Sequence, residues 1–358
     1  MDKQKTLAFI KELTDAPGVS GFEDEAVAVI RRHGEGLGQF SEDAMRNLYI
    51  RRSGWKDGRP VLMLDAHTDE VGFMVRNIRP NGTLDFVPLG GWVASCVPAH
   101  KVRVRTNDGQ WIPGIIASKP PHFMTEAERK QAPEIANMVI DTGAGSESEA
   151  RNDYGISVGA PVIPDVSFEY RESHDIMIGK AFDNRLGSAA IVSTLKELAG
   201  ADLAVNVTGA LAAQEEVGLR GATVTAQTVK PDICIAFEGS PADDTLSDSG
   251  VIQTAVKKGP MLRHYDMRMI TNPRFQRFAL NMAKDRGIPV QEAVRTGGST
   301  DAGVIHLTGK AVPVIVIGLP ARYIHTHYSI ASYFDFENAV RLACELIKKL
   351  DEKIIAGF

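Results

Sequence analysis

Two adjacent glutamates, Glu215 and Glu216, follow an apolar segment and could perform acid–base and metal chemistry. The preceding residues, 204–213, have the continuous apolar character of a buried parallel strand. Ligands of open α/β sheets bind at the carboxyl ends of strands, and neighbouring residues of an extended segment point to opposite sides. One carboxylate could therefore hold a metal ion while the other faces a reacting group. The alternative is a solvated pair of acids, which these two residues alone do not exclude.

Other acids and imidazoles also follow apolar segments along the chain. These residues are His67, Asp69, Asp183, Glu238 and His325. Because the carboxyl ends of parallel strands meet at one edge of a sheet, we expect these side chains to converge. Histidines mixed with carboxylates suit Zn²⁺, Co²⁺ or Mn²⁺, and a carboxylate-rich site can hold two such ions about 3.5–4 Å apart.

The elements that must position these side chains alternate between strands and helices. Apolar periodicity predicts helices at 3–15 and 23–33, with Ser20 as a candidate cap, and strands at 39–53 and 60–66. The alternation resumes after about residue 176. Helices are then expected at 185–198, 273–286 and 334–350, and strands at 204–213, 232–237, 288–294 and 312–317. Repeated βα units predict an α/β fold, a three-layer sandwich around a mixed, mostly parallel sheet.

Residues 71–163 differ in sequence pattern from the rest of the chain. Short β-type segments alternate there with turn signals such as Asn81-Gly82 and Gly90-Gly91. This pattern predicts a small β-barrel-like domain inserted into a catalytic domain formed by residues 1–70 and 164–358.

The composition excludes several classes of protein. A chain of 358 residues with 44% hydrophobic content can bury a large core, and its net charge of −5 argues against nucleic acid as a partner. The longest strongly apolar run, residues 311–320, is too short to span a bilayer. Three widely spaced cysteines and a polar N-terminus predict a cytoplasmic protein without disulfides.

Four segments together resemble the signature segments of the tetrahedral (TET) metallo-aminopeptidases, which include glutamyl and deblocking aminopeptidases. The segments are His67–Phe73, Lys180–Arg185, Gln214–Gly218 and Arg322–His325. The resemblance covers nearly the whole chain, including the inserted β module. It places the chain in the larger clan of co-catalytic di-zinc exopeptidases.

The resemblance implies a role for each residue of the constellation. His67 and Glu238 would bind the first metal, Glu216 and His325 the second, and Asp183 would bridge the two. Many members of the family carry Asp where this chain has Glu238.

Further roles follow from the same resemblance. Asp69 would orient His67, and Glu215 would be the general base. A cis peptide bond is expected after Asp183. His327 is a competing metal ligand, but the Tyr-Ile-His spacing favours His325.

Two further sets of residues are considered for the site. The glycine-rich loop with Gly297, Gly298 and Ser299 is expected to line the substrate pocket, because glycines permit close backbone approach. His122 is a minor candidate for contact with substrate, whereas the remaining histidines are expected to be structural or exposed.

The function implied is removal of N-terminal residues from short peptides, using two divalent ions (Zn, Co or Mn) per subunit. By resemblance, the β module would mediate dimerisation, and dimers would assemble into a hollow dodecamer. Three alternatives remain open at this point. They are another hydrolase of the clan (a deacylase or carboxypeptidase), an endoglucanase-like glycoside hydrolase, and a non-catalytic metal-binding scaffold.

Overall fold

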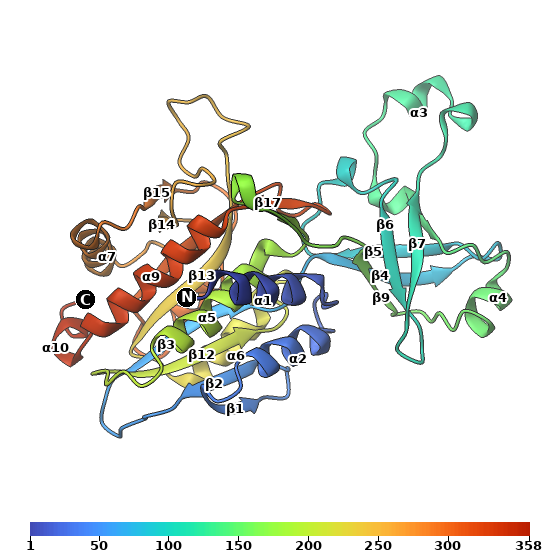
Figure 1. Ribbon diagram of the computed structural model, residues 1–358. Coiled ribbons are helices and arrows are strands. Elements are labelled where there is room, and N and C mark those ends of the chain that lie inside the picture. The colour runs from blue at the N-terminus through green and yellow to red at the C-terminus, as the bar shows by residue number, and fades with distance from the viewer.

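The computed structural model describes residues 1–358 and shows a layered α/β body with a β module beside it (Figure 1). The central sheet has eleven strands. Along its main path the order is β1 (Gly38–Glu42), β2 (Leu48–Arg52), β12 (Asn206–Ala212), β3 (Val61–His67), β13 (Ile233–Pro241), β16 (Val314–Arg322), β17 (Ser329–Ala331), β11 (Ile176–Gly179) and β10 (Glu169–Arg171). Two further strands, β14 (Met261–Tyr265) and β15 (Gln291–Val294), attach through β16.

The centre of the sheet is parallel and its margins are antiparallel. Strand β12 pairs with β3, β3 with β13, and β13 with β16, all in parallel register. Strands β1, β2, β10, β11 and β17 pair antiparallel at the two sides. The prediction of a mixed, mostly parallel sheet is confirmed.

Helices cover both faces of this sheet and complete the three layers (Figure 1). One face carries α1 (Lys3–Asp15), α2 (Asp24–His33), α5 (Phe182–Glu197), α7 (Pro273–Arg286) and α9 (Tyr333–Lys349), which is followed by α10 (Glu352–Ile355). The other face carries α6 (Arg220–Val229) and α8 (Ala302–Ile305). Side chains of β3 alternate between them: Leu62 and Leu64 enter a 51-residue core, and Met63 enters a 14-residue core.

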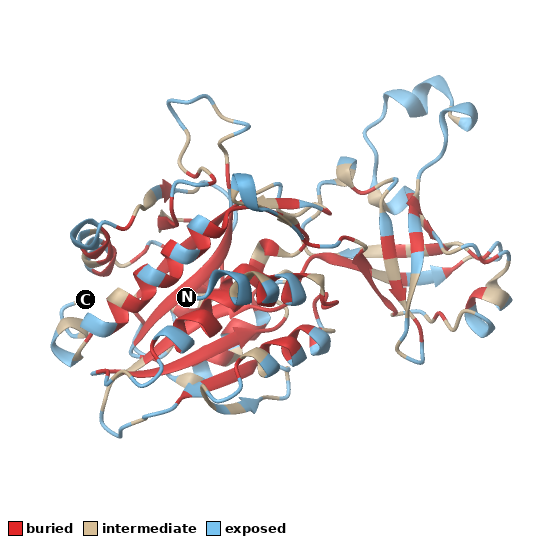
Figure 2. Cartoon of the chain, viewed as in Figure 1, coloured by how far each residue is buried: buried red, intermediate tan, exposed pale blue.

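The inserted module is a closed barrel with its own apolar core. Its strands run in the order β4 (Gly72–Ile78), β5 (Leu84–Leu89), β8 (Val139–Asp141), β7 (Trp111–Ala117), β6 (Lys101–Arg105) and β9 (Pro161–Pro164). Sixteen buried residues fill it. The short helices α3 (Glu126–Lys130) and α4 (Glu147–Asn152) lie in its loops, and the α3 loop is exposed along most of its length (Figure 2). The predicted β-barrel-like module is therefore present.

Two local predictions were wrong. The strand expected at 39–53 is a hairpin, because Asp43 accepts hydrogen bonds from the backbone N–H groups of Met45 and Asn47 at 2.9 and 3.1 Å and bends the chain. Ser20 does not cap α2; its hydroxyl donates to Asp69 Oδ2 at 2.6 Å instead. None of the helices is long and apolar enough to cross a membrane.

Candidate metal centre

The carboxyl ends of the central strands bring the sequence-predicted residues together. We call this edge, formed by the ends of β3, β12, β13 and β16, the rim. His67 ends β3, and Glu215 and Glu216 follow β12 directly. Glu238 lies inside β13 and not after it, because β13 stays paired with β16 as far as Pro241.

Asp183 lies between the two histidines of the site. Its Oδ1 is 3.2 Å from His67 Nε2, and its Oδ2 is 3.5 Å from His325 Nε2. Glu238 Oε1 is 3.5 Å from His67 Nε2, and Glu216 Oε2 is 3.6 Å from His325 Nε2. The donors thus form two clusters, one around each imidazole, and the Asp183 carboxylate has one oxygen in each.

Asp69 fixes the orientation of the His67 ring. His67 Nδ1 lies 3.2 Å from the Asp69 carbonyl oxygen and 3.3 Å from Asp69 Oδ1. With Nδ1 occupied in this way, Nε2 is the nitrogen that faces the other donors. An acid behind a histidine ligand sets its tautomer and raises its basicity.

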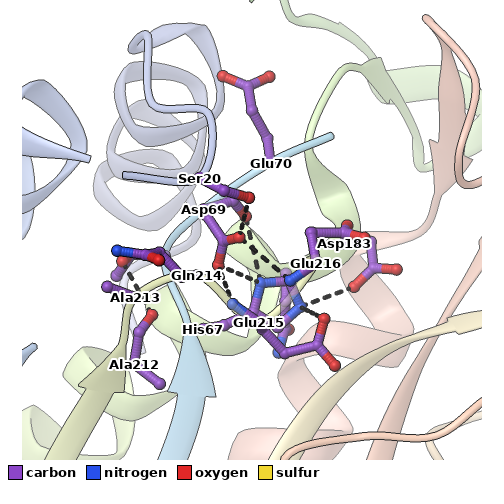
Figure 3. A network of polar contacts seen from close by, with 12 residues as sticks. Ser20, His67, Asp69, Glu70, Asp183, Ala212, Ala213, Gln214, Glu215 and Glu216 are labelled. Carbon is purple, nitrogen blue, oxygen red and sulfur yellow. Dashed lines mark hydrogen bonds and ion pairs between the residues drawn. The ribbon is translucent and has the colours of Figure 1, made fainter. Parts of the chain in front are cut away.

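The same carboxylate holds the loop that carries the two glutamates (Figure 3). Asp69 accepts hydrogen bonds from the backbone N–H groups of Glu215 at 2.9 Å and Glu216 at 3.2 Å. Buried Glu23 accepts from the N–H of Gln214 at 3.1 Å, just before them. Glu23 was not predicted as part of the site, because in the sequence it reads only as the start of a helix.

Glu215 lies farther from His67 than the other acids of the first cluster do. Its Oε2 is 3.9 Å from His67 Nε2, farther than the carboxylates of Asp183 and Glu238. Two groups of donor atoms lie close enough to hold a cation. They are His67, Glu215 and Glu238, and His67, Asp183 and Glu216, so His67 belongs to both groups and His325 to neither. His325 joins the site through its pair contacts with Asp183 and Glu216.

Burial and mutual repulsion disturb the protonation of the cluster. Burial, and then the neighbouring carboxylates, raise the pKa of Glu238 to about 7 and the pKa values of Glu215 and Glu216 well above their usual range. Burial alone would lower the pKa of His325, but Asp183 and Glu216 outweigh it and raise that pKa to about 9. The two imidazoles hold the pKa of Asp183 below its usual value against burial.

The residues present fit divalent metal ions. Four acids and His67 converge here, His325 lies beside two of the acids, and Glu216 Oε1 is buried with no hydrogen-bond partner. Buried carboxylates normally need a counter-charge, and a cation supplies it. Histidine nitrogens and carboxylate oxygens are the donors that Zn²⁺, Co²⁺ and Mn²⁺ accept.

Gly239 makes room for Asp183. A Cβ on Gly239 would lie 2.6 Å from Asp183 Cα and 2.9 Å from its Oδ1, so a side chain at this position would displace the acid. The peptide bond between Asp183 and Asn184 is cis, as the resemblance implies.

A cavity of about 450 Å³ opens beside the cluster. Gly297, Gly298 and Ser299 line it, together with Asp183, Glu215, Glu216, Glu238 and His325. Three arginines that sequence reasoning missed, Arg263, Arg268 and Arg295, also line it. Arg263 and Arg268 lie in and just after β14 and Arg295 follows β15, and no sequence motif marks these positions.

The remaining candidate histidines lie outside the cluster. His327 is buried with both ring nitrogens unpartnered, and its ring stacks on His100 with centroids 4.0 Å apart. His122 lies in an exposed loop of the barrel and does not line the cavity. His325 is therefore the histidine that faces Asp183 and Glu216.

Comparison with protein families identifies the class of protein. Residues 46–342 match the family model described as M42 glutamyl aminopeptidase, and residues 4–29 match a model described as AMPT. The class is thereby defined as aminopeptidases, hydrolases that act on peptide bonds. Within that class, the chain belongs to the M42 glutamyl aminopeptidase family.

Curated relatives and solved structures match over almost the full length. A glutamyl aminopeptidase of Lactococcus lactis is 34% identical over 97% of each chain, and a lysyl aminopeptidase of Pyrococcus furiosus is 29% identical over 95% of this chain and 96% of its own. A TET aminopeptidase from a marine sediment thaumarchaeon is 39% identical over 99% of each chain, with a TM-score of 0.95. The PhTET1-12s structure, described as a dodecamer, is 27% identical over 96% of this chain and 99% of its own, with a TM-score of 0.85.

Proposed function

We propose that this chain removes N-terminal residues from short peptides with the help of two divalent metal ions. The observation that carries the proposal is the Asp183 carboxylate, whose two oxygens lie 3.2 and 3.5 Å from the imidazoles of two separate donor clusters. A carboxylate shared in this way is the usual bridge of a two-metal hydrolytic site.

The donor set divides between the two ions. His67 and Glu238 would hold the first, His325 and Glu216 the second, and Asp183 both. When bound, such ions supply Lewis acidity to a hydrolytic water and to the carbonyl that it attacks.

Glu215 acts as the general base in this proposal. Its carboxylate lines the cavity, and its Oε2 is farther from His67 Nε2 than the carboxylates of Asp183 and Glu238 are, which supports a role in proton transfer. Glu215 would take a proton from the attacking water at one carboxylate oxygen and then deliver it to the leaving amine. Asp69 maintains this arrangement by binding the backbone of Glu215 and the ring of His67.

A panel of aminoacyl p-nitroanilides tests the proposal with apo-protein and added Zn²⁺, Co²⁺ or Mn²⁺. We expect metal-dependent release of nitroaniline from free-amine substrates and none from N-acetylated ones. Hydrolysis of N-blocked substrates only would indicate a deacylase, and release of C-terminal residues a carboxypeptidase. Chelator-insensitive cleavage of a β-glucan would indicate a glycoside hydrolase, and metal binding without any turnover a scaffold.

Assembly is a second part of the proposal. We assign residues 1–70 and 164–358 to catalysis and residues 71–163 to dimerisation. The barrel exposes apolar side chains that a partner copy could cover: Phe123 is 73% exposed and Ile115 50%. The dodecamer described for PhTET1-12s supports assembly of the dimers into a similar particle.

Light scattering with bound metal measures this assembly directly. One chain has a mass of 38.8 kDa, so a stable particle of that mass would contradict the assignment. Phe123→Asp should reduce the mass of the particle, whereas Val158→Asp, at another exposed barrel position, serves as the matched control.

A further inference from the structure

The loop that carries His325 contacts the barrel. It joins β16 to β17 and spans residues 323–328. Two of its residues, Tyr323 and His325, have positive φ values of 62° and 60°. Residues other than glycine rarely adopt this left-handed conformation, and it persists only where the surrounding structure holds it. The contacts of this loop therefore decide where the His325 imidazole lies.

The ring of His327, in the same loop, packs into the barrel. It is buried and stacks on the ring of His100 with centroids 4.0 Å apart. Its centroid lies 5.0 Å from that of Trp92 and 6.5 Å from that of Phe73 in β4. Trp92 and Phe73 also stack on each other, with centroids 4.5 Å apart. Three aromatic rings of the inserted module thus surround one side chain of the α/β domain.

The backbone of the barrel loop before β6 contacts the same part of the metal centre. Val93 N–H donates to the His325 carbonyl oxygen at 3.5 Å, which is long for a hydrogen bond. A Cβ on Gly91 would lie 3.0 Å from His325 Nδ1, and a Cβ on Gly90 would lie 3.1 Å from Glu216 Oε2. These glycines therefore lie directly against the two donors proposed for the second metal, His325 and Glu216.

The donors proposed for the first metal are held from within the α/β domain instead. His67 Nδ1 lies 3.3 Å from Asp69 Oδ1, and Ser188 Oγ donates to the His67 carbonyl oxygen at 2.9 Å. Glu238 is fixed by its place in β13, which is paired with β16 on both sides of it. A change in the contact between the barrel and the loop should therefore reach the second metal and spare the first.

We infer that the barrel is a structural part of the second metal site, and that His327 is the positioning residue that holds His325 in place. This inference rests on the proposed two-metal function. His327 acts through its ring and not through its nitrogens, since neither nitrogen has a hydrogen-bond partner. A phenyl ring should therefore replace it, whereas a methyl group should not. Removing a residue that orients a metal ligand typically lowers metal affinity 10- to 100-fold.

Calorimetric titration of the apo-protein with Zn²⁺ tests the inference on the wild type, His327→Ala and His327→Phe. The wild type should bind two ions. His327→Ala should weaken one of the two sites about 10- to 100-fold and leave the other at the wild-type value. His327→Phe keeps the ring and should keep both affinities. If His327→Phe loses the same site as His327→Ala, the nitrogens of His327 matter, and the inference is overturned in favour of a direct metal ligand.

Gly91→Ala tests the same contact from the barrel side. Gly91 is exposed and its φ lies outside the left-handed region, so the fold should accept alanine there. The added methyl group would press on the imidazole, and the same site should weaken about tenfold, the lower end of the range for such partners. Ile140→Ala is the matched control. It lies in the same barrel core, but on β8, which pairs with β5 and β7, and it should leave both affinities unchanged.

The contrary results are distinct. Equal weakening of both sites in His327→Ala, or the same selective weakening in Ile140→Ala, would mean that general stability is responsible, and each overturns the inference. Two tight sites that survive both His327→Ala and Gly91→Ala overturn it as well. If His327→Ala does not fold, Gly91→Ala decides alone. A wild type that binds fewer than two ions would instead contradict the proposed two-metal function, before any variant is compared.

Discussion

The barrel and the rim of the central sheet are constructed on opposite principles. Within residues 71–163 the buried side chains are apolar except for Thr106. The α/β domain instead buries many charged or ionisable groups at and behind the rim. They include Asp65, His67, Asp69, Glu70, Lys180, Arg185, Glu238 and Asp301. The protein therefore separates a module that is optimised for packing from one that carries chemistry.

The difference shows where the fold tolerates unfavourable burial. Lys180 and Glu70 compensate each other at 2.6 Å, but both carboxylate oxygens of Asp65 and of Asp301 are buried without partners. Burial, followed by the charge of Glu238, raises the pKa of Asp65 to about 8. Buried polar groups without hydrogen-bond partners destabilise a fold, so the apolar cores of the α/β domain must offset them. The following changes should separate the two principles.

The largest effect is expected at Glu215. Glu215→Gln should lower kcat about 10²- to 10⁴-fold, the usual range for loss of a general base, while metal content stays at the wild-type value. Its thermal midpoint should not fall, because the change removes a buried charge. Glu126→Gln, on the exposed barrel helix α3, is the control and should leave kcat unaltered. If the variant lost metal in proportion to its loss of kcat, Glu215 would not be the general base.

The barrel core should give the reverse result. Ile140 is fully buried and faces Leu84 and Ile116 on the neighbouring strands. Ile140→Ala should lower the free energy of unfolding by about 2–5 kcal/mol, the usual cost of such a cavity. At 25 °C the folded enzyme should keep kcat/KM within about twofold. Denaturant titration and initial rates measure the two quantities, and a parallel fall in both would show that the regions are not separate.

A smaller effect should distinguish the two halves of the metal centre. Glu238→Ala removes a donor near His67, whereas His325→Ala removes one near Glu216. Each variant should weaken one of two metal sites at least about 10- to 100-fold and leave the other nearly unchanged. Calorimetric metal titration of both variants makes the comparison. If Glu238→Ala leaves both affinities intact, Glu238 does not bind metal.

The sequence predicts the parts of this molecule that depend on local pattern. Apolar runs that end in His67 or Glu215 marked the parallel strands and the rim together, because strand direction fixes where side chains converge. The hairpin at Asp43 depends on a turn that the Asp43 side chain stabilises by hydrogen bonds to the backbone. The hydrophobic periodicity of the sequence does not predict such a turn. The extension of β13 through Glu238 depends on its pairing with β16, which lies about 80 residues further along the chain. Contacts of this kind are tertiary, and the arginine-lined wall of the cavity, which includes Arg268, was missed for the same reason.

The smallest effect is expected where the two regions touch at the surface. Trp111 Nε1 of β7 donates to Glu25 Oε1 of α2 at 2.7 Å and so links the barrel to the α/β domain. Trp111→Phe keeps an aromatic ring but removes the donor. Because Glu25 is exposed and water can replace the lost partner, the free energy of unfolding should fall by only about 0.5–1.5 kcal/mol. Glu25→Gln keeps an acceptor and should have a smaller effect.

The value of kcat/KM should be unchanged in both variants, since this link lies apart from the cavity residues. A tenfold loss of kcat/KM in Trp111→Phe, with metal content preserved, would mean that the contact between the barrel and α2 affects catalysis at the metal centre. The separation of packing from chemistry would then be wrong.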